Sequence, residues 1–136
     1  MLTAGCGGAR PTPSPGGMVA VLGALAAHGA SVTDVVAGDS GCSDPSLHDN
    51  AQRITLTLAA DGRTYEVYLL RWRRQSDFDA AAAAFAACVA DAAASPGGAD
   101  AMETVELAPW RAYGPGWGRE MRDVIAQSLA SAAGGQ

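Results

Sequence analysis

Side chains that can carry chemistry are densest between residues 34 and 50, where Asp39, Asp44, His48 and Asp49 all lie. Carboxylate oxygens are the hard ligands that Ca²⁺ prefers. The three aspartates are therefore the candidate ligands of a cation-dependent module, and His48 would be available to a small enzyme. Their spacing lacks the regular alternation and the closing glutamate of calcium-binding loops, and one histidine does not make a zinc site.

Turn formation explains the same residues more simply. Asp44 followed by Pro45 matches a helix N-cap with a proline in the first turn, and it predicts a short helical turn through His48. Aspartate, serine and glycine are also the usual residues of tight turns. We therefore expect a turn-rich loop over residues 37–52 without a metal ion, and we keep the cation module as the alternative.

A second candidate site is the segment over residues 109–118, which reads P-W-R-A-Y-G-P-G-W-G. Its prolines and glycines predict a loop, and loops held by a rigid scaffold often carry function. Flat aromatic faces beside an arginine suit sugars or extended peptides. We predict ligand binding here, by Trp110, Arg111, Tyr113 and Trp117. The alternative is that the two tryptophans fill a core that is short of large residues.

The basic run over residues 71–74 (R-W-R-R) could clamp an anion, with the indole stacked on a guanidinium. Such a run is more often a solvated strand end that protects a sheet edge, and we favour that interpretation.

The chain has three cysteines, at positions 6, 42 and 88. Cys6 stands apart in a glycine-rich leader, which leaves Cys42 and Cys88 as the natural pair. In an oxidising compartment a bridge between them would contribute about 4 kcal/mol through the entropy of the unfolded chain. In the cytosol both would be small buried thiols.

A β-hairpin and the helix after it are the elements that must position these residues. Asp61-Gly62 lies between two runs rich in β-branched and aromatic residues, and this predicts a two-residue turn. Such a turn places the apolar side chains of both strands on one face. The predicted cross-strand pairs are Leu58–Tyr65, Leu56–Val67 and Ile54–Leu69.

An amphipathic helix is predicted to cover that apolar face. Ser76 and Asp79 match a capping box at its start, and apolar residues recur at helical spacing from Phe78 to Ala92. Further elements are a helix over residues 18–28 ending at Gly29, strands over 32–36 and 103–107, and a helix over 121–132. The order α-β-β-β-α-β-α predicts a two-layer α+β fold, with about four mostly antiparallel strands and helices on one face.

The length and net charge of the chain limit the classes of function that it can have. One domain over residues 18–133 is expected of a 136-residue chain, with a frayed tail over 134–136. The net charge of −5, with nine arginines and no lysine, argues against nucleic-acid binding. Residues 18–27 are too few for a membrane span. No paired carboxylates at catalytic spacing, phosphate-binding glycine loop or Cys-His cluster occurs in the sequence, so a non-catalytic domain without a cofactor is favoured.

The start of the chain, L-T-A-G-C-G-G over residues 2–8, resembles the end of a bacterial lipoprotein signal peptide. The resemblance implies that Cys6 is lipidated, and residues 9–17 would then be a stiff Pro/Gly-rich tether. The charged and apolar parts of such a signal are absent from this sequence, so we expect a truncated signal. With Cys6 and this tether, the chain as a whole resembles small exported lipoproteins of high-GC Gram-positive bacteria.

Together these features predict an exported domain, anchored at the cell membrane only through lipid or released outside the cell. It would bind an unknown envelope partner or ligand near residues 109–118, in an oligomeric state that the sequence does not specify. The alternatives are the cation-dependent module or small enzyme described above, and a cytosolic accessory protein with free thiols.

Overall fold

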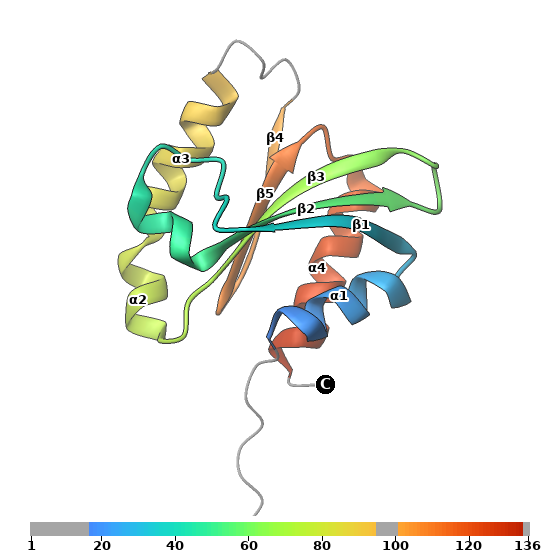
Figure 1. Ribbon diagram of the computed structural model, residues 1–136, viewed down its shortest axis with the longest axis horizontal. Coiled ribbons are helices and arrows are strands. Elements are labelled where there is room, and N and C mark those ends of the chain that lie inside the picture. The colour runs from blue at the N-terminus through green and yellow to red at the C-terminus, as the bar shows by residue number, and fades with distance from the viewer. Residues whose placement is uncertain (1–16, 95–100, 135–136) are drawn as a thin grey trace, which may run out of the picture.

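A computed structural model describes residues 17–94 and 101–134. They form an α+β fold, as the sequence predicted (Figure 1). The elements in chain order are α1 (Met18–Ala27), β1 (Ala30–Ala37), the 3-10 helix η1 (Pro45–Asn50), β2 (Ala51–Leu58), β3 (Thr64–Arg71), α2 (Gln75–Ala80), α3 (Ala82–Ala94), β4 (Met102–Leu107), β5 (Trp110–Pro115) and α4 (Arg119–Ala133).

The sheet has five strands in the order β1-β2-β3-β5-β4, and every neighbouring pair is antiparallel. About four strands were predicted. The additional strand is β5, which comes from the segment predicted to be a loop, so that prediction is wrong. Pro109 and Pro115 stand at the two ends of the strand rather than within it, and Trp110 to Gly114 alternate between the two faces of the sheet.

The central hairpin has the predicted faces but a different register. Leu56 lies opposite Tyr65 and Ile54 opposite Val67, two residues from the predicted pairing. The connection is longer than two residues because the Leu58 amide donates to the Arg63 carbonyl, which encloses residues 59–62. An even shift preserves the alternation of side chains, so the apolar residues still share one face.

That apolar face is covered by α1 and α4, not by the helix that follows the hairpin (Figure 1). Val21 and Leu25 of α1 and Met121, Ile125 and Leu129 of α4 are all buried against it. Gly29 ends α1 with a φ of 86°, which confirms the predicted helix stop. On the edge strand β4, Val105 packs against this core, whereas Leu107 is exposed.

The opposite face of the sheet carries a second core, under α2, α3 and η1. Leu70 and Tyr113 project from the sheet, and Leu47, Phe78 and Phe85 pack against them. The molecule therefore has three layers, with helices on both faces of the sheet rather than on one. The predicted capping box is also wrong. The N-cap of α2 is Arg74, which places Ser76 inside the helix.

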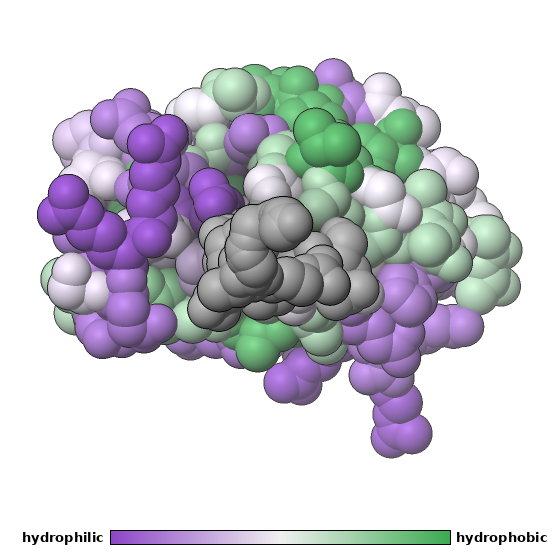
Figure 2. Space-filling view, turned by 90° about the horizontal axis from the view of Figure 1, so that it is seen from below, coloured by the Kyte–Doolittle hydropathy of each residue, from purple (hydrophilic) through white to green (hydrophobic). Residues whose placement is uncertain are grey.

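In the part of the chain that the structure describes, no helix is both long and apolar enough to cross a bilayer. From below, apolar surface gathers over α1, whereas the side that carries α2 is more polar (Figure 2). Val19 of α1 is 83% exposed. Gly134 caps α4. The tether with Cys6, and residues 135–136 of the predicted frayed tail, lie outside the described residues.

Candidate functional site beside the disulfide

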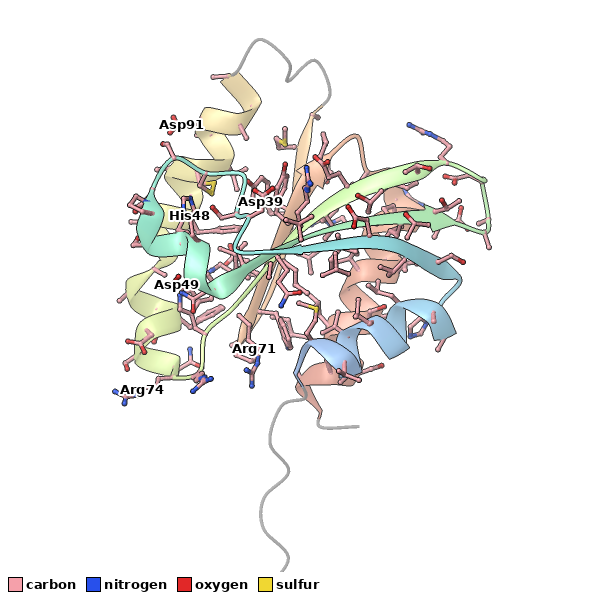
Figure 3. All side chains as sticks on the ribbon, in the orientation of Figure 1. Asp39, His48, Asp49, Arg71, Arg74 and Asp91 are labelled. Carbon is pink, nitrogen blue, oxygen red and sulfur yellow. A yellow bond between two sulfur atoms is a disulfide. The ribbon has the colours of Figure 1, made fainter. Side chains whose placement is uncertain are left out.

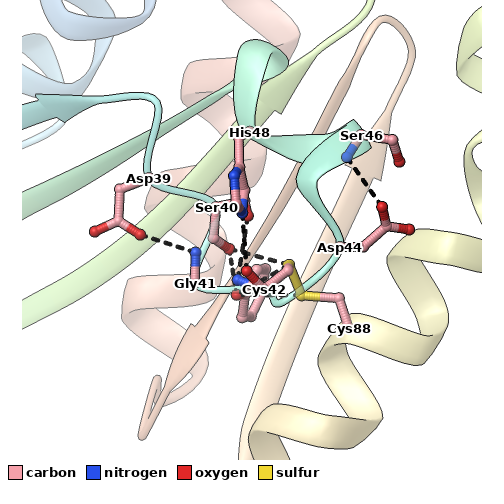
Figure 4. Close-up of a disulfide and its surroundings, with 9 residues drawn as sticks. Asp39, Ser40, Gly41, Cys42, Asp44, Ser46, His48 and Cys88 are labelled. Carbon is pink, nitrogen blue, oxygen red and sulfur yellow. Dashed lines mark hydrogen bonds between the residues drawn. A yellow bond between two sulfur atoms is a disulfide. The ribbon is translucent and has the colours of Figure 1, made fainter.

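Cys42 and Cys88 form the predicted disulfide, with their Cα atoms 5.3 Å apart (Figure 4). Cys42 lies in the loop after β1, and Cys88 is on the buried side of α3. The bond therefore attaches the loop over residues 38–44 to the helix layer on the second face of the sheet.

Hydrogen bonds fix the backbone of this loop. Asp39 Oδ1 accepts from the amide of Gly41, and Ser40 Oγ accepts from the amide of Cys42 (Figure 4). His48 Nε2 donates to the Cys42 carbonyl oxygen at 2.9 Å. The hydroxyl of Tyr113, on β5, donates to the buried carbonyl oxygen of Ser40. The conformation of the loop is thus set by its own turns, by η1 and by the central sheet.

Gly41 is required at the closest approach of this loop to the sheet. Its φ is +70°, in the left-handed region that disfavours other residues. A Cβ at this position would also press on the Tyr113 hydroxyl and come within 2.8 Å of the Tyr68 ring. The loop backbone therefore lies directly on two tyrosine side chains.

A hollow of about 470 Å³ opens between this loop, the sheet and α3. We call it the disulfide hollow. Its lining comes from the loop, β3, α3, β4 and β5, and includes both cysteines of the disulfide. The lining residues are Gly41, Cys42, Ser43, Glu66, Tyr68, Cys88, Asp91, Ala92, Met102, Tyr113 and Pro115.

Two stacked tyrosines form one wall of the disulfide hollow. The rings of Tyr68 and Tyr113 are 4.9 Å apart and nearly parallel, and Phe85 meets Tyr113 edge to face. Burial, helped by the Glu66 carboxylate, raises the pKa of Tyr68 to about 12. Burial also raises the pKa of Tyr113. Both phenols therefore stay protonated at neutral pH and act as neutral hydrogen-bonding groups.

The charged groups that line the disulfide hollow are both acidic. Glu66 comes from β3 and Asp91 from the exposed side of α3. Glu66 Oε1 accepts a 3.0 Å hydrogen bond from the Tyr68 hydroxyl, and Oε2 lies 3.9 Å from Arg53 Nη1. Arg53 also lies 3.4 Å from Asp39 Oδ2. Among the described residues, no arginine lines the hollow.

The aromatic segment over residues 109–118 does not form an exposed binding loop. Trp110 and Tyr113 have no exposed surface, Arg111 is 3% exposed and Trp117 is 5% exposed. The two tryptophans belong to the first core, as the alternative interpretation of the sequence had it. The Trp117 indole donates to the Glu66 carbonyl oxygen, which bridges β3 and β5 where the two strands diverge. Of the four predicted residues, only Tyr113 reaches the disulfide hollow.

Arg111 is enclosed by aromatic rings rather than presented to a ligand. Its guanidinium carbon lies 3.7 Å from the centroid of the Phe78 ring, and Trp72 and Phe85 are also within cation–π distance. Nη1 donates to the Phe78 carbonyl oxygen at 2.7 Å, and Nε donates to Glu106 at 2.8 Å. This arginine joins β5, β4 and α2.

The acidic loop does not assemble a cation site. Asp39 stabilises its own turn and pairs with Arg53, while Asp44 accepts from the Ser46 amide, as predicted of an N-cap. Asp39 and Asp49 lie apart in Figure 3. Within residues 17–94 and 101–134, no group of three or more His, Cys, Asp or Glu side chains is placed to hold a metal ion. The structure therefore gives the cation module no support.

The basic run at the end of β3 divides between core and surface. Trp72 is buried, and Arg71 lies over the Trp110 ring. Arg73 and Arg74 are exposed and border a second, open hollow of about 560 Å³ with Asp77. Arg73 and Arg74 therefore match the solvated strand end that the sequence favoured, whereas Trp72 does not, and β3 is an interior strand rather than an edge to be protected.

No sequence pattern pointed to the disulfide hollow. Glu66 and Tyr68 lie on the hairpin face opposite the one that the predicted helix was expected to cover, and Asp91 is not part of the apolar stripe of that helix. The usable signal was Tyr68, a large aromatic residue on a face that otherwise carries Thr55, Thr57 and Glu66. Such a residue indicates that part of the face is covered.

Comparison with known proteins adds no assignment, because no protein-family model, no curated protein and no solved structure matches this chain.

Proposed function

We propose that this chain is an exported, non-catalytic domain of the cell envelope, tethered through Cys6, that binds a small ligand in the disulfide hollow. The alternative of a cytosolic accessory protein requires free thiols at positions 42 and 88.

The disulfide is the observation that carries the proposal. Thiols stay reduced in the cytosol, whereas disulfides persist in secreted and envelope proteins. Cys42 and Cys88 are bonded to each other, and the rest of the loop is fixed around them by hydrogen bonds from Asp39, Ser40 and His48. This arrangement supports a structural bond of an oxidising compartment.

The shape of the disulfide hollow supports ligand binding rather than turnover. Its volume of about 470 Å³ is within the range of small-molecule sites, and its walls are held by a disulfide and by strand pairing. Among residues 17–94 and 101–134, its lining includes neither a histidine nor a free thiol, and so offers no nucleophile paired with a histidine base. We therefore place the proposed ligand in the disulfide hollow, on the second face of β5, and not at the predicted aromatic loop.

Fractionation of the native host tests the cellular part of the proposal. When the host is grown with an alkyne fatty acid, the full-length gene product should be labelled and should sediment with the membrane. Cys6→Ala should abolish the label, whereas Cys42→Ala, which leaves Cys6 intact, should keep it. An unlabelled wild-type protein in the cytoplasmic fraction would overturn the proposal.

A further inference from the structure

We propose that the ligand of the disulfide hollow is a small organic cation, an ammonium or guanidinium group carried on an apolar body. This inference rests on the proposed function, since it names the chemical class of the ligand bound at that site.

The charge of the lining selects against anions. Among the described residues of the lining, the charged side chains are Glu66 and Asp91, which come from two different walls, β3 and α3. An anion in the hollow would meet two carboxylates and no lining cation. A cation between them gains attraction from both, in a hollow where protein walls reduce screening by water.

Glu66 has acceptor capacity left for an N–H donor. Its Oε1 is used by the Tyr68 hydroxyl at 3.0 Å. Its Oε2 is 3.9 Å from Arg53 Nη1, which is longer than a hydrogen bond. Arg53 divides its charge between this oxygen and Asp39. A carboxylate oxygen accepts strong bonds from ammonium and guanidinium groups, so this position suits the charged head of the ligand.

Asp91 supplies the second charge. Within the described part of the chain its side chain has neither a hydrogen bond nor an ion pair. It lies on α3 one helical turn after Cys88 (Figure 3), and it is one of the residues that line the hollow. Because Asp91 is exposed, its attraction is longer in range and more sensitive to salt than that of Glu66.

The remaining walls suit an apolar body. The lining also includes residues with apolar side chains and the two cysteines of the disulfide: Tyr68, Met102, Pro115, Ala92, Cys42 and Cys88. Tyr68 is backed by the parallel ring of Tyr113, which holds its face in place. An aromatic face also attracts a cation directly. A body of one ring or a short chain would therefore lie on Tyr68 with its charged end at Glu66.

Three probes that share a phenyl body separate charge from shape. Phenethylamine is a cation, 2-phenylethanol is neutral and phenylacetate is an anion at neutral pH. Titration of each into the oxidised protein, followed by ¹H–¹⁵N NMR, should give saturable shifts of the Gly41, Ser43 and Met102 amides with phenethylamine. The neutral probe should bind about tenfold more weakly, because it lacks the charged hydrogen bond, and the anion should not bind.

Matched variants test how much each of the two carboxylates contributes to binding of the cation. Glu66→Gln should weaken phenethylamine binding by about tenfold, and Asp91→Asn by about threefold with loss of the salt dependence. Asp77→Asn removes the same charge from α2, outside the hollow, and should leave binding unchanged.

The outcomes distinguish the two proposals. Equal binding of all three probes at the hollow, or no effect of Glu66→Gln, would overturn the cation assignment and leave the hollow as a binding site. If none of the probes moves the hollow amides at millimolar concentration, both the cation assignment and the binding role are wrong.

Discussion

The hydroxyl of Tyr113 donates its hydrogen to the carbonyl oxygen of Ser40, across 73 positions of the chain. The hydroxyl oxygen of Tyr113 also lies 3.5 Å from Cys88 Sγ and 3.7 Å from Cys42 Sγ. One buried phenol on β5 therefore holds the loop, the disulfide and α3 together. The disulfide hollow is a consequence of this contact, because the loop and α3 form two of its walls.

Removing that hydroxyl should destabilise the protein without opening a cavity. Tyr113→Phe leaves the buried Ser40 carbonyl without this partner, at a cost of about 1–3 kcal/mol. Tyr68→Phe is the control, since its hydroxyl bonds the half-exposed Glu66, which water can solvate instead. Urea unfolding measures both. If the two variants lose the same free energy of unfolding, Tyr113 does not have this role.

Two glycines with similar backbone angles should respond differently to alanine. Gly41 and Gly62 have φ values of 70° and 68°, so each substitution incurs about 1 kcal/mol of backbone strain. A Cβ at Gly62 meets open space, but at Gly41 it meets the Tyr68 ring and the Tyr113 hydroxyl. We expect Gly41→Ala to cost about 3 kcal/mol in total. Equal losses in thermal unfolding would show that the loop does not lie on the tyrosines.

Arg111 should prove structural. Arg111→Ala removes the hydrogen bond to the Phe78 carbonyl and leaves a cavity among aromatic rings, and we expect a loss of about 3 kcal/mol in the free energy of unfolding. Arg119→Ala removes an exposed arginine and should change stability by less than about 0.5 kcal/mol. If the Arg111→Ala variant were as stable as wild type, the structural role would be wrong and the predicted role of Arg111 in ligand binding would be favoured.

Alkaline pH should unfold the protein through its tyrosines. The pKa of each of the three is raised: by the hydrogen bond to Asp61 for Tyr65, and mainly by burial for Tyr68, to about 12, and for Tyr113. A raised folded-state pKa adds stability that is complete below the unfolded value of about 10 and is lost as pH rises through the folded value.

Stability should therefore be level up to about pH 9 and fall between about pH 10 and 12. Ultraviolet absorbance of tyrosinate, compared in folded and urea-unfolded protein, measures the shift directly. Tyr68→Phe should make the fall shallower. If Tyr68 and Tyr113 titrated near 10 in the folded protein, the burial of these two rings would be contradicted.

The sequence predicted which face of the sheet a side chain lies on better than it predicted which residues pair or pack together. Alternation along β2 and β3 identified the buried side chains correctly, since period two is unchanged by a shift of two residues. It could not exclude that shift, because Asp61-Gly62 fits a four-residue connection as well as a two-residue turn. The helix predicted from Phe78 to Ala92 is present as two helices, α2 and α3, that are divided at Ala81. Its partner was not predicted, because the apolar residues of the second face come partly from β5.

The candidate site was missed for the same reason. The prolines and glycines around Trp110 and Tyr113 indicated a loop, whereas in the structure this segment forms β5, an interior strand of the sheet. Without that strand, the sequence did not place Tyr113 beside Tyr68. The disulfide could be predicted because it needed only two cysteines and a leader that set the third apart.

Mass spectrometry of protein purified from the native host without reductant tests the central claim most directly. After alkylation and digestion, the account predicts a linked peptide pair containing Cys42 and Cys88, unmodified until reduction. Reduction should lower the free energy of unfolding by about 4 kcal/mol, since the bond closes a loop across 46 positions. Two alkylated thiols at 42 and 88 in native material would contradict both the envelope location and the hollow built around the bond.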